Sequence, residues 1–400
     1  MVKSHRSILD SDQYKFTMQK AVMQLFPNEK VKYTFINRRG AIFPEGFGER
    51  LRELVNEFSG ITMLPEEKEN INAFLASKGI TYFDPAYLEF LKSYKYDPTE
   101  VTINHTSTDL SITIEGYWFR TILWEVPLMA TISELYFEMT GKIVDFTEDL
   151  SKHNQDKFIA LHKVGAKFVE FGTRRRYSYD NHKKVLEDFL VAMSKDSSLY
   201  NCFLGTSNLH FAMMFDLKPM GTMAHEWIQF HAAKYGPILG NKLALENWIS
   251  VFKGDLGIAL PDTLTTNVFL RTFDKVLARI FDGTRQDSDS PFDYVDKMHP
   301  HYTSLGINPQ TKSVMFSDNL KSVDAVRAVI EYSKGKMNPL EGLGTWITND
   351  VGVAPLDIVI KLTGITTNGK MIYAVKLSDS KSKHTGDPET IKLHKTILGI

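Results

Sequence analysis

The sequence contains one cysteine, Cys202, among its 400 residues. A single thiol cannot form an intramolecular disulfide or a cysteine-based metal cage, which favours a reducing compartment such as the cytoplasm. No apolar run approaches the roughly 20 residues that span a bilayer, and residues 1–6 carry no apolar signal core. The formal net charge is −1, which gives no indication of a polyanionic partner. We therefore expect a cytoplasmic protein that binds neither membranes nor nucleic acids.

Four hundred residues leave room for one large or two ordinary domains. The first third mixes helical and strand patterns without strict alternation, which predicts an α+β domain over residues 1–144. The expected elements are a helix capped by Asp12, a strand at 31–37, a hairpin of 101–104 and 110–114 turning at 107–109, and a helix at 122–139 that carries Pro127 and is closed by Gly141.

From about residue 145, apolar strand-like runs alternate with amphipathic helices. Repeated strand-then-helix units predict a parallel sheet with helical crossovers, and at this count an incomplete or closed α/β barrel over residues 145–352. The tail, residues 353–400, returns to strands and is expected to pack on the first domain, because it is short for a core of its own. The strand-like runs are 167–171, 202–205, 256–260, 276–281, 314–316 and 342–345, and in the tail 358–362 and 371–377 around the turn residues 367–369.

Each apolar run of the predicted barrel ends in glycine or polar residues. In a barrel these ends share the rim that carries the active site. Arginines bind phosphate bidentately, glycines admit backbone N–H groups to oxygen atoms, and carboxylates hold Mg²⁺ together with phosphate. These residue types predict a site for a phosphorylated, anionic ligand, with Asp287 and Asp318 as the metal candidates. The rim segments are 172–176, 205–208, 221–225, 262–263, 283–288, 317–319 and 342–345.

Two segments of this rim also admit a plainer interpretation. The triplet Arg174, Arg175 and Arg176 by itself is typical of a solvated basic turn. His225, at the end of an apolar run, by itself favours a structural histidine at a strand end, although its ordinary pKa also suits proton transfer or phosphoryl acceptance. Their place among the other rim segments shifts both interpretations toward ligand binding.

Several segments, in the same order along the chain, resemble the nicotinate phosphoribosyltransferase family, of the type II phosphoribosyltransferases. The resemblance implies transfer of phosphoribosyl from 5-phosphoribosyl 1-diphosphate to nicotinate, the first step of NAD synthesis from nicotinate. It further implies coupling to ATP hydrolysis through a phosphohistidine, with Mg²⁺ as the metal. The segments that carry the resemblance are 9–18, 171–176, 205–208, 219–227, 316–320 and 376–379.

The resemblance also implies residue roles. His225 matches the histidine that is phosphorylated, and Asp262 the acid that orients it. Phe171 matches the aromatic that stacks on the pyridine ring, and Tyr14 a tyrosine that reaches the other face from a neighbouring subunit, which implies a homodimer. The remaining matches are Thr173, Arg174, Thr206 and Ser207 for the anionic substrates, Arg285, Asp287, Ser288 and Asp318 for the phosphoribosyl diphosphate, and Gly342, Gly344 and Thr345 for the 5-phosphate.

Two positions bear on specificity. Relatives that prefer nicotinamide carry an aspartate where this chain has Ser207, and a neutral side chain there favours a substrate carboxylate. Asp289 and Ser290 replace a glycine and an acid of the family pattern, which puts metal or phosphate affinity at this loop in question. The alternatives that stay open are a nicotinamide-using relative and a non-catalytic, nucleotide-binding regulatory homologue.

Overall fold

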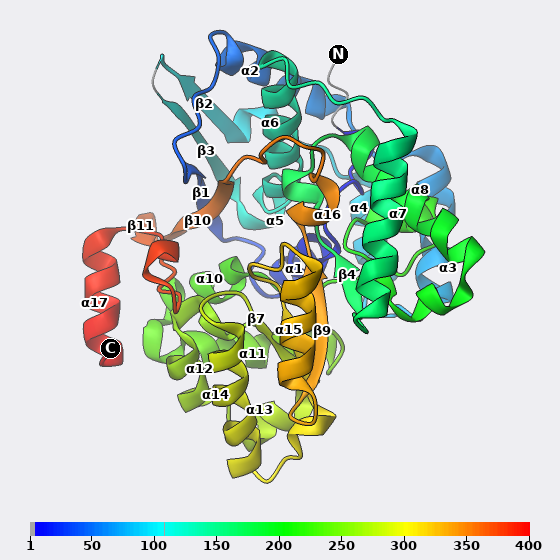
Figure 1. Ribbon diagram of the computed structural model, residues 1–400. Helices are drawn as coiled ribbons and strands as arrows, with labels where there is room; N and C mark the ends of the chain where they lie inside the picture. The colour runs from blue at the N-terminus through cyan, green and yellow to red at the C-terminus, as the bar shows by residue number, and fades with distance from the viewer. Residues whose placement is uncertain (1–4, 108) are drawn as a thin grey trace.

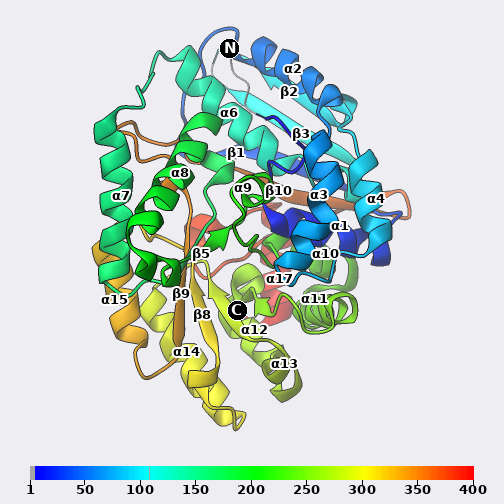
Figure 2. The ribbon, with the colours of Figure 1, turned by 90° about the vertical axis from the view of Figure 1, so that its right-hand side faces the viewer.

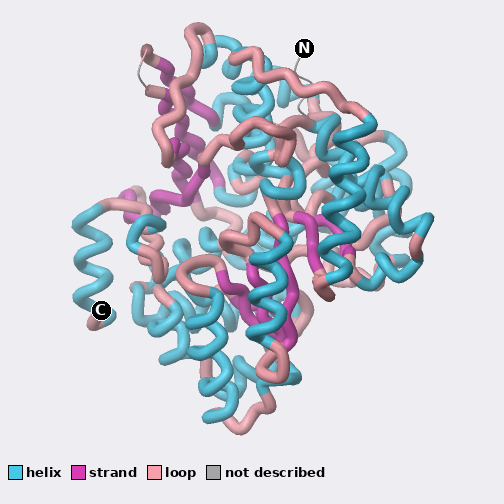
Figure 3. Tube along the Cα trace, in the orientation of Figure 1, coloured by secondary structure: helices cyan, strands magenta, loops and turns pink. Residues whose placement is uncertain are grey.

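The computed structural model describes residues 5–107 and 109–400. The expectations for residues 1–4, and for Thr108 in the hairpin turn, lie outside the described residues. Two groups of strands organise the fold, an antiparallel sheet in the upper half and a parallel sheet in the lower half of the molecule (Figures 1 and 3). The predicted mixed α/β class is therefore confirmed. Among the described residues, no helix is long and apolar enough to cross a membrane.

The antiparallel sheet joins the two ends of the chain. Tail strand β10 pairs along its length with β1, which brings this strand of the tail into the sheet of the N-terminal part. The domain boundaries at residues 144 and 352 stay a prediction. In order across the sheet the strands are β11 (Lys370–Tyr373), β10 (Ile358–Thr367), β1 (Lys30–Asn37), β3 (Leu110–Tyr117) and β2 (Val101–His105).

The hairpin between β10 and β11 turns at Asn368 and Gly369, with φ of 51° and 73°. Positive φ at both central residues suits the right-handed twist of the flanking strands. The predicted strand over 371–377 is too long, because β11 ends at Tyr373. From there the chain leaves the sheet and runs to the barrel, where the Leu377 amide donates to the Thr263 carbonyl over 2.8 Å.

The parallel sheet is an incomplete barrel. Its edge strands β5 and β6 are spanned by the loop before His225: the Met220 amide donates to the Thr206 carbonyl over 2.9 Å, and the Thr222 hydroxyl to the Ile258 carbonyl over 2.9 Å. Strands β8 and β9 run side by side in the lower half of Figure 2. The strands are, in order, β5 (Phe203–Thr206), β4 (Phe168–Glu170), β9 (Asn338–Leu343), β8 (Ser313–Phe316), β7 (Gly283–Gln286) and β6 (Ile258–Ala259).

Helices cover both sheets. Around the N-terminal sheet and its approaches lie α1 (Gln13–Leu25), α2 (Phe47–Glu57), α3 (Pro65–Ser77), α4 (Pro85–Ser93), α5 (Trp118–Thr121) and α6 (Glu125–Met139). The barrel half contains α7 (Glu148–Lys163), α8 (Tyr179–Lys195), α9 (Leu209–Met214), α10 (His225–Tyr235), α11 (Pro237–Phe252), α12 (Thr266–Thr272), α13 (Lys275–Ile280), α14 (Pro291–Ser304), α15 (Val323–Ser333) and α16 (Thr345–Thr348), and α17 (Pro388–Leu398) ends the chain.

Three further local predictions are wrong. The run at 276–281 is helix α13, because Asp274 caps it by accepting from two backbone amides, and the strand follows as β7. The helix expected at 122–139 begins at Glu125, which leaves Pro127 in the first turn, where no backbone donor is lost. Asp12 sits at the N-cap position of α1, but its side chain turns away from the helix to Ser207.

Aromatic packing holds α10 against the N-terminal half. The rings of Trp118 and Phe230 stack with their centroids 4.1 Å apart. The ring of Phe26, the residue after α1, has its centroid 4.8 Å from that of Phe230. Both Trp118 and Trp227 are fully buried. Because α10 begins at His225, this apolar contact fixes the histidine relative to both sheets.

Candidate active site

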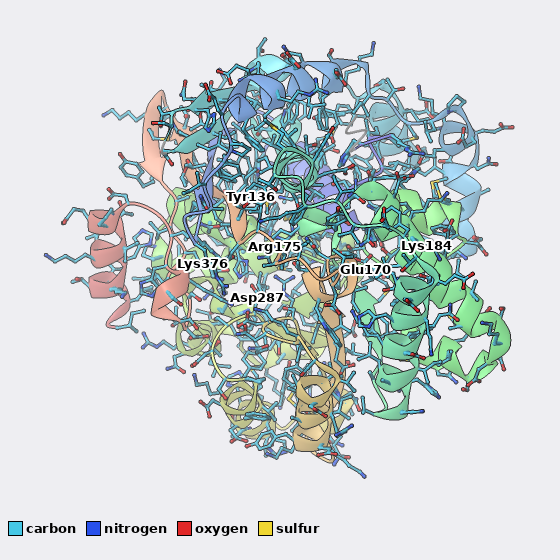
Figure 4. The ribbon with its side chains drawn as sticks, turned by 45° about the horizontal axis from the view of Figure 1, so that its top comes forward. Tyr136, Glu170, Arg175, Lys184, Asp287 and Lys376 are labelled. Carbon is cyan, nitrogen blue, oxygen red and sulfur yellow. The ribbon has the colours of Figure 1, made fainter. Side chains whose placement is uncertain are left out.

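His225 stands at the centre of a buried charged cluster. Its Nε2 lies 2.9 Å from Asp262 Oδ1, 2.9 Å from Lys376 Nζ and 3.3 Å from Asp287 Oδ2. Lys376 also contacts Asp262 Oδ2 at 2.9 Å, and Ser288 donates to that oxygen over 2.8 Å. Figure 4 shows Asp287, from the loop after β7, beside Lys376, from the C-terminal tail. The ring therefore lies among charges and not in packed hydrocarbon.

The cluster keeps the imidazole neutral and the carboxylates ionised. Burial and the Lys376 ammonium lower the pKa of His225 to about 4, against the opposing effect of Asp262. Burial by itself would raise the pKa of Asp262, but Lys376 and His225 hold it well below its ordinary value. A neutral imidazole whose Nδ1 has no hydrogen-bond partner among the described residues can accept an electrophile.

Arg285 and Asp287 extend this cluster along β7 and the loop after it. Arg285 Nη2 lies 4.0 Å from Asp287 Oδ2, and its Nη1 lies 3.5 Å from the Met223 carbonyl. Ser317, after β8, donates to Asp287 Oδ1 over 2.9 Å. Burial would raise the pKa of Asp287, but Arg285, His225 and Lys376 lower it. The ends of three neighbouring barrel strands thus meet at one charged rim.

The basic triplet is not a solvated turn, since its three arginines have different partners. Arg176 is fully buried and binds both carboxylate oxygens of Asp10 at 2.7 Å. Arg175 lies 3.3 Å from Asp357, and burial lowers its pKa to about 10. Arg174 is partly exposed and is the member that faces the other candidate residues. Arg174 is therefore the member of the triplet that lies against another candidate residue, Tyr14.

Arg174 lies beside Tyr14, one of the two residues predicted to contact the pyridine ring. Its Nε lies 3.7 Å from Asp12 Oδ2 and its Nη1 3.5 Å from Glu125 Oε1, while its Cζ lies 5.9 Å from the centre of the Tyr14 ring. Tyr14 is buried within its own chain, and its hydroxyl has no hydrogen-bond partner among the residues that the structure describes. A Cβ on Gly221 would come within 2.9 Å of the Tyr14 amide, so glycine permits this close approach.

Ser207 and Thr206 are occupied by protein contacts. Ser207 has no exposed surface and donates to Asp12 over 2.7 Å, while Thr206 donates to Glu170 over 2.6 Å. Burial raises the pKa of Asp12, partly offset by Arg174 and Ser207. The nearby Thr173 hydroxyl accepts from Asn208 over 3.3 Å. These three buried hydroxyls are therefore engaged by neighbouring side chains of the protein itself.

The predicted 5-phosphate segment lies at the end of β9. Phe171 donates its amide to the Leu343 carbonyl over 2.7 Å, and a Cβ on Gly342 would meet the Phe171 ring at 3.4 Å. Gly344 precedes the short helix α16, which begins at Thr345. The structure therefore places the predicted stacking aromatic directly beside the predicted phosphate segment, at the same end of the parallel sheet.

The metal candidates do not form a common cage. Asp318 pairs with Lys383 at 2.7 Å, and burial raises its pKa. Ligand atoms of His225, Asp262 and Asp287 lie within 4.8 Å of one another, but the Lys376 ammonium already contacts all three. A dedicated metal ion does not fit this cluster as it stands. Mg²⁺ fits better as a companion of a bound diphosphate.

The loop that departs from the family pattern is accommodated locally. Asp289 has φ of 63°, in the region that glycine adopts most readily and aspartate tolerates. Its side chain is exposed, and its amide donates to Ser380 over 3.1 Å. Ser290 caps α14 by accepting from the Asp293 amide over 3.3 Å. Both replacements therefore have an ordinary structural explanation.

Sequence reasoning missed several charged residues of the site. Lys15 is fully buried between Glu125 and Glu226, the latter at 2.5 Å, and it links α1 to the residue after His225. Lys376 lay within a recognised motif but received no role. Burial lowers the pKa of Lys361, on β10, to about 7, with Lys376 and Arg174 adding to the effect and Glu125 opposing it. The available signal was a lysine at a position where the helix or strand pattern predicts a buried residue, because such a lysine needs charged partners.

Comparison with known proteins decides the family. The nicotinate phosphoribosyltransferase family model matches residues 166–400, and the model of its N-terminal domain matches residues 9–133. The chain belongs to the nicotinate phosphoribosyltransferase family. Nicotinate phosphoribosyltransferases of Chromohalobacter salexigens, over 98% of each chain, and of Desulforapulum autotrophicum, over 96% of this chain and 97% of the other, are each 44% identical to it.

Solved structures agree over the whole length. The crystal structure of nicotinate phosphoribosyltransferase from Porphyromonas gingivalis superposes with a TM-score of 0.92 at 37% identity, covering 99% of this chain and all of the other. That of a putative nicotinate phosphoribosyltransferase from Saccharomyces cerevisiae has a TM-score of 0.91 at 33% identity and covers 99% of this chain and 98% of the other. The fold of this chain is that of its family.

Proposed function

We propose that the protein transfers phosphoribosyl from 5-phosphoribosyl 1-diphosphate to nicotinate, giving nicotinate mononucleotide and pyrophosphate, with ATP hydrolysis coupled through phosphorylated His225. The observation that carries the proposal is the contact of neutral, buried His225 with Asp262, on the rim that also holds Arg285 and Asp287. Family membership supports the substrates, and the imidazole environment supports the phosphoryl step.

The charged residues suit glycosyl transfer with pyrophosphate departure. Such a reaction passes through an oxocarbenium-like state, so the enzyme mainly positions the reactants and neutralises the leaving group. Arg285, held near Asp287, and Arg174, balanced by Asp12 and Glu125, would bind anionic groups of the substrates. Phe171 would stack on the pyridine ring while Gly342, Gly344 and Thr345 bind the 5-phosphate.

The phosphoryl step needs a neutral nucleophile at working pH. With a pKa of about 4, His225 keeps a lone pair on one ring nitrogen at neutral pH. Asp262, itself held by Ser288 and Lys376, would stabilise the positive charge that develops on the ring as the N–P bond forms. ATP supplies the phosphoryl group. Mg²⁺ would neutralise polyphosphate charge, with Asp287 as the carboxylate within reach.

Nicotinate is proposed over nicotinamide because Ser207 is neutral and Arg174 is at hand to bind a carboxylate. The nicotinamide-using and the regulatory, non-catalytic alternatives remain outcomes of the test. The altered loop at Asp289 gives the regulatory alternative little support, because that side chain is exposed. We further propose a cytoplasmic enzyme and a homodimer. The homodimer is proposed from the family resemblance, because Tyr14 lies near Arg174 of its own chain and gives no reason for a second subunit.

Turnover of labelled nicotinate and of labelled nicotinamide, each with and without ATP, tests this function. We expect nicotinate to be consumed with ATP stimulation, and the protein to carry acid-labile, base-stable phosphate after incubation with ATP. His225→Ala should lose that phosphate, while Arg175→Met, on the same rim, should keep it. Preference for nicotinamide, no turnover, or phosphate that persists in His225→Ala would each contradict the proposal.

A further inference from the structure

Two groups compete for one nitrogen of His225. Nε2 lies 2.9 Å from a carboxylate oxygen of Asp262 and 2.9 Å from the ammonium of Lys376. A ring nitrogen that carries a proton can donate to Asp262, and one that carries a lone pair can accept from Lys376. It cannot do both at once. One of these two short contacts is therefore unfavourable in either tautomer.

The tautomer decides which nitrogen is a nucleophile. If Nε2 accepts from Lys376, the proton of the neutral ring is on Nδ1, which then has no lone pair to offer. If Nε2 donates to Asp262, the lone pair is on Nδ1, which has no hydrogen-bond partner among the described residues. The position of the Lys376 ammonium thus bears directly on the reactivity of His225.

The ammonium can be drawn away without moving the backbone. Lys376 exchanges two backbone hydrogen bonds with Thr385, of 2.8 and 3.0 Å, which hold its main chain in place. Its side chain lies 3.9 Å from Asp287, on the rim where Arg285 also lies. A phosphate oxygen is a stronger acceptor for an ammonium than a neutral ring nitrogen, because the hydrogen bond is assisted by charge. The ammonium would therefore give up Nε2 for phosphate and not its 2.9 Å contact with the charged Asp262 Oδ2.

We propose that Lys376 is a positioning residue that selects the tautomer of His225 according to whether a polyphosphate is bound. Without polyphosphate, Lys376 donates to Nε2 and the proton is on Nδ1. With polyphosphate, the ammonium turns to a phosphate oxygen, the proton moves through water from Nδ1 to Nε2, and Nε2 donates to Asp262. The choice of tautomer does not depend on the proposed function, because the ring has a tautomer whether or not it is phosphorylated. Only the consequence of that choice, the reactivity of His225 toward ATP, rests on the proposed phosphohistidine.

The phosphoryl step that follows is balanced. The Nδ1 lone pair forms a bond to the γ-phosphorus of ATP, the bond from that phosphorus to the β–γ bridging oxygen breaks, and ADP leaves with the electron pair. The ring keeps its proton on Nε2 and carries positive charge, which the Asp262 carboxylate stabilises. Before polyphosphate binds, the same nitrogen is protonated and unreactive, which protects His225 from other electrophiles.

Nitrogen NMR of protein labelled with ¹⁵N in histidine reads the tautomer directly. At pH 7.5, well above its pKa of about 4, the ring is neutral, and its signals among the 12 histidines are assigned by their loss in His225→Gln. The probe is inorganic pyrophosphate, with its binding followed by calorimetry. For the wild type we expect the proton on Nδ1 when no pyrophosphate is bound. Once pyrophosphate is bound, we expect it on Nε2.

Variants separate this role from a structural one. Lys376→Met removes the donor and should show Nε2 protonated with or without pyrophosphate, while Lys376→Arg should retain the wild-type response. Lys383→Met is the matched control: it removes a neighbouring lysine that binds Asp318 and the Asp287 carbonyl but does not contact His225, and its tautomer should match the wild type. Should Lys376→Met fail to fold, the wild type with and without pyrophosphate still decides the matter.

The proposal is overturned if the free wild type shows Nε2 protonated, if bound pyrophosphate leaves the tautomer unchanged, or if Lys376→Met retains the proton on Nδ1. These outcomes are independent of the proposed function, which fails instead if ATP leaves no acid-labile phosphate on His225. A wild type that changes tautomer but is never phosphorylated would support the role of Lys376 and refute the coupling to ATP.

Discussion

Ser207 donates its hydroxyl to Asp12 over a distance of 2.7 Å, and neither residue has exposed surface. The residue expected to distinguish nicotinate from nicotinamide is therefore tied to a buried carboxylate, which Arg174 approaches at 3.7 Å. We therefore expect substrate preference at this position to act through the Ser207, Asp12 and Arg174 group as a whole. In the proposed function, the neutral hydroxyl would let Arg174 present positive charge to a substrate carboxylate.

We expect Ser207→Asp to weaken nicotinate use more than nicotinamide use. The new carboxylate would face Asp12 at close range and compete for Arg174, which a substrate carboxylate also needs. The measurement is kcat/KM for both substrates, with Ser207→Ala as the control. The control loses one donor to Asp12, at a cost of about 1–3 kcal/mol of stability, and should keep the substrate preference. Equal losses for both substrates in Ser207→Asp would defeat the argument.

Asp289→Gly should leave or improve the affinity for 5-phosphoribosyl 1-diphosphate. The residue has φ of 63°, and its charge is exposed, so glycine relieves backbone strain without removing a contact of the side chain. Asp289→Val is the contrasting variant, because a β-branched residue does not tolerate positive φ. We expect the KM for the diphosphate substrate to rise in Asp289→Val. A large loss in Asp289→Gly would mean that the loop is built for another ligand.

Arg176→Met should destabilise the protein by about 3–5 kcal/mol, because it leaves the buried Asp10 carboxylate without its bidentate partner. Arg175→Met, whose side chain is one-third exposed beside Asp357, should cost about 1 kcal/mol or less. Urea unfolding of the two variants under the same conditions checks the difference. Similar losses in both would show that the triplet acts as one surface cluster.

His225 makes stability depend on pH below neutrality. Its pKa is about 4 in the folded chain and near 6.5 when unfolded, so between these values the unfolded state binds more protons. Its contribution, on the order of 3 kcal/mol, is fully present above pH 6.5 and is lost as the pH falls toward 4. Urea unfolding from pH 4.5 to 7.5 should therefore show a shallower pH dependence for His225→Gln than for the wild type. Parallel curves would contradict the pKa shift.

The order of elements was determined by the sequence itself. Alternating and helical periodicities are local, so β1, the hairpin of β2 and β3, and the strand–helix units of the barrel could be predicted from them, as could the turn at Asn368 and Gly369. Glycine and polar residues after each apolar run likewise predicted one rim, because parallel strands all end on the same side of a sheet.

Only the tertiary structure decided which charges meet. Lys376 reaches His225 from 151 residues away because β11 ends early and the tail enters the barrel, and Lys15 reaches Glu226 across 211 residues. The length of β11 and the partner of a buried lysine depend on long-range packing and on the desolvation of paired charges, which no local pattern encodes. The same holds for Asp12, whose local sequence favours a helix cap, but whose side chain accepts from Ser207, a residue 195 positions further along the chain.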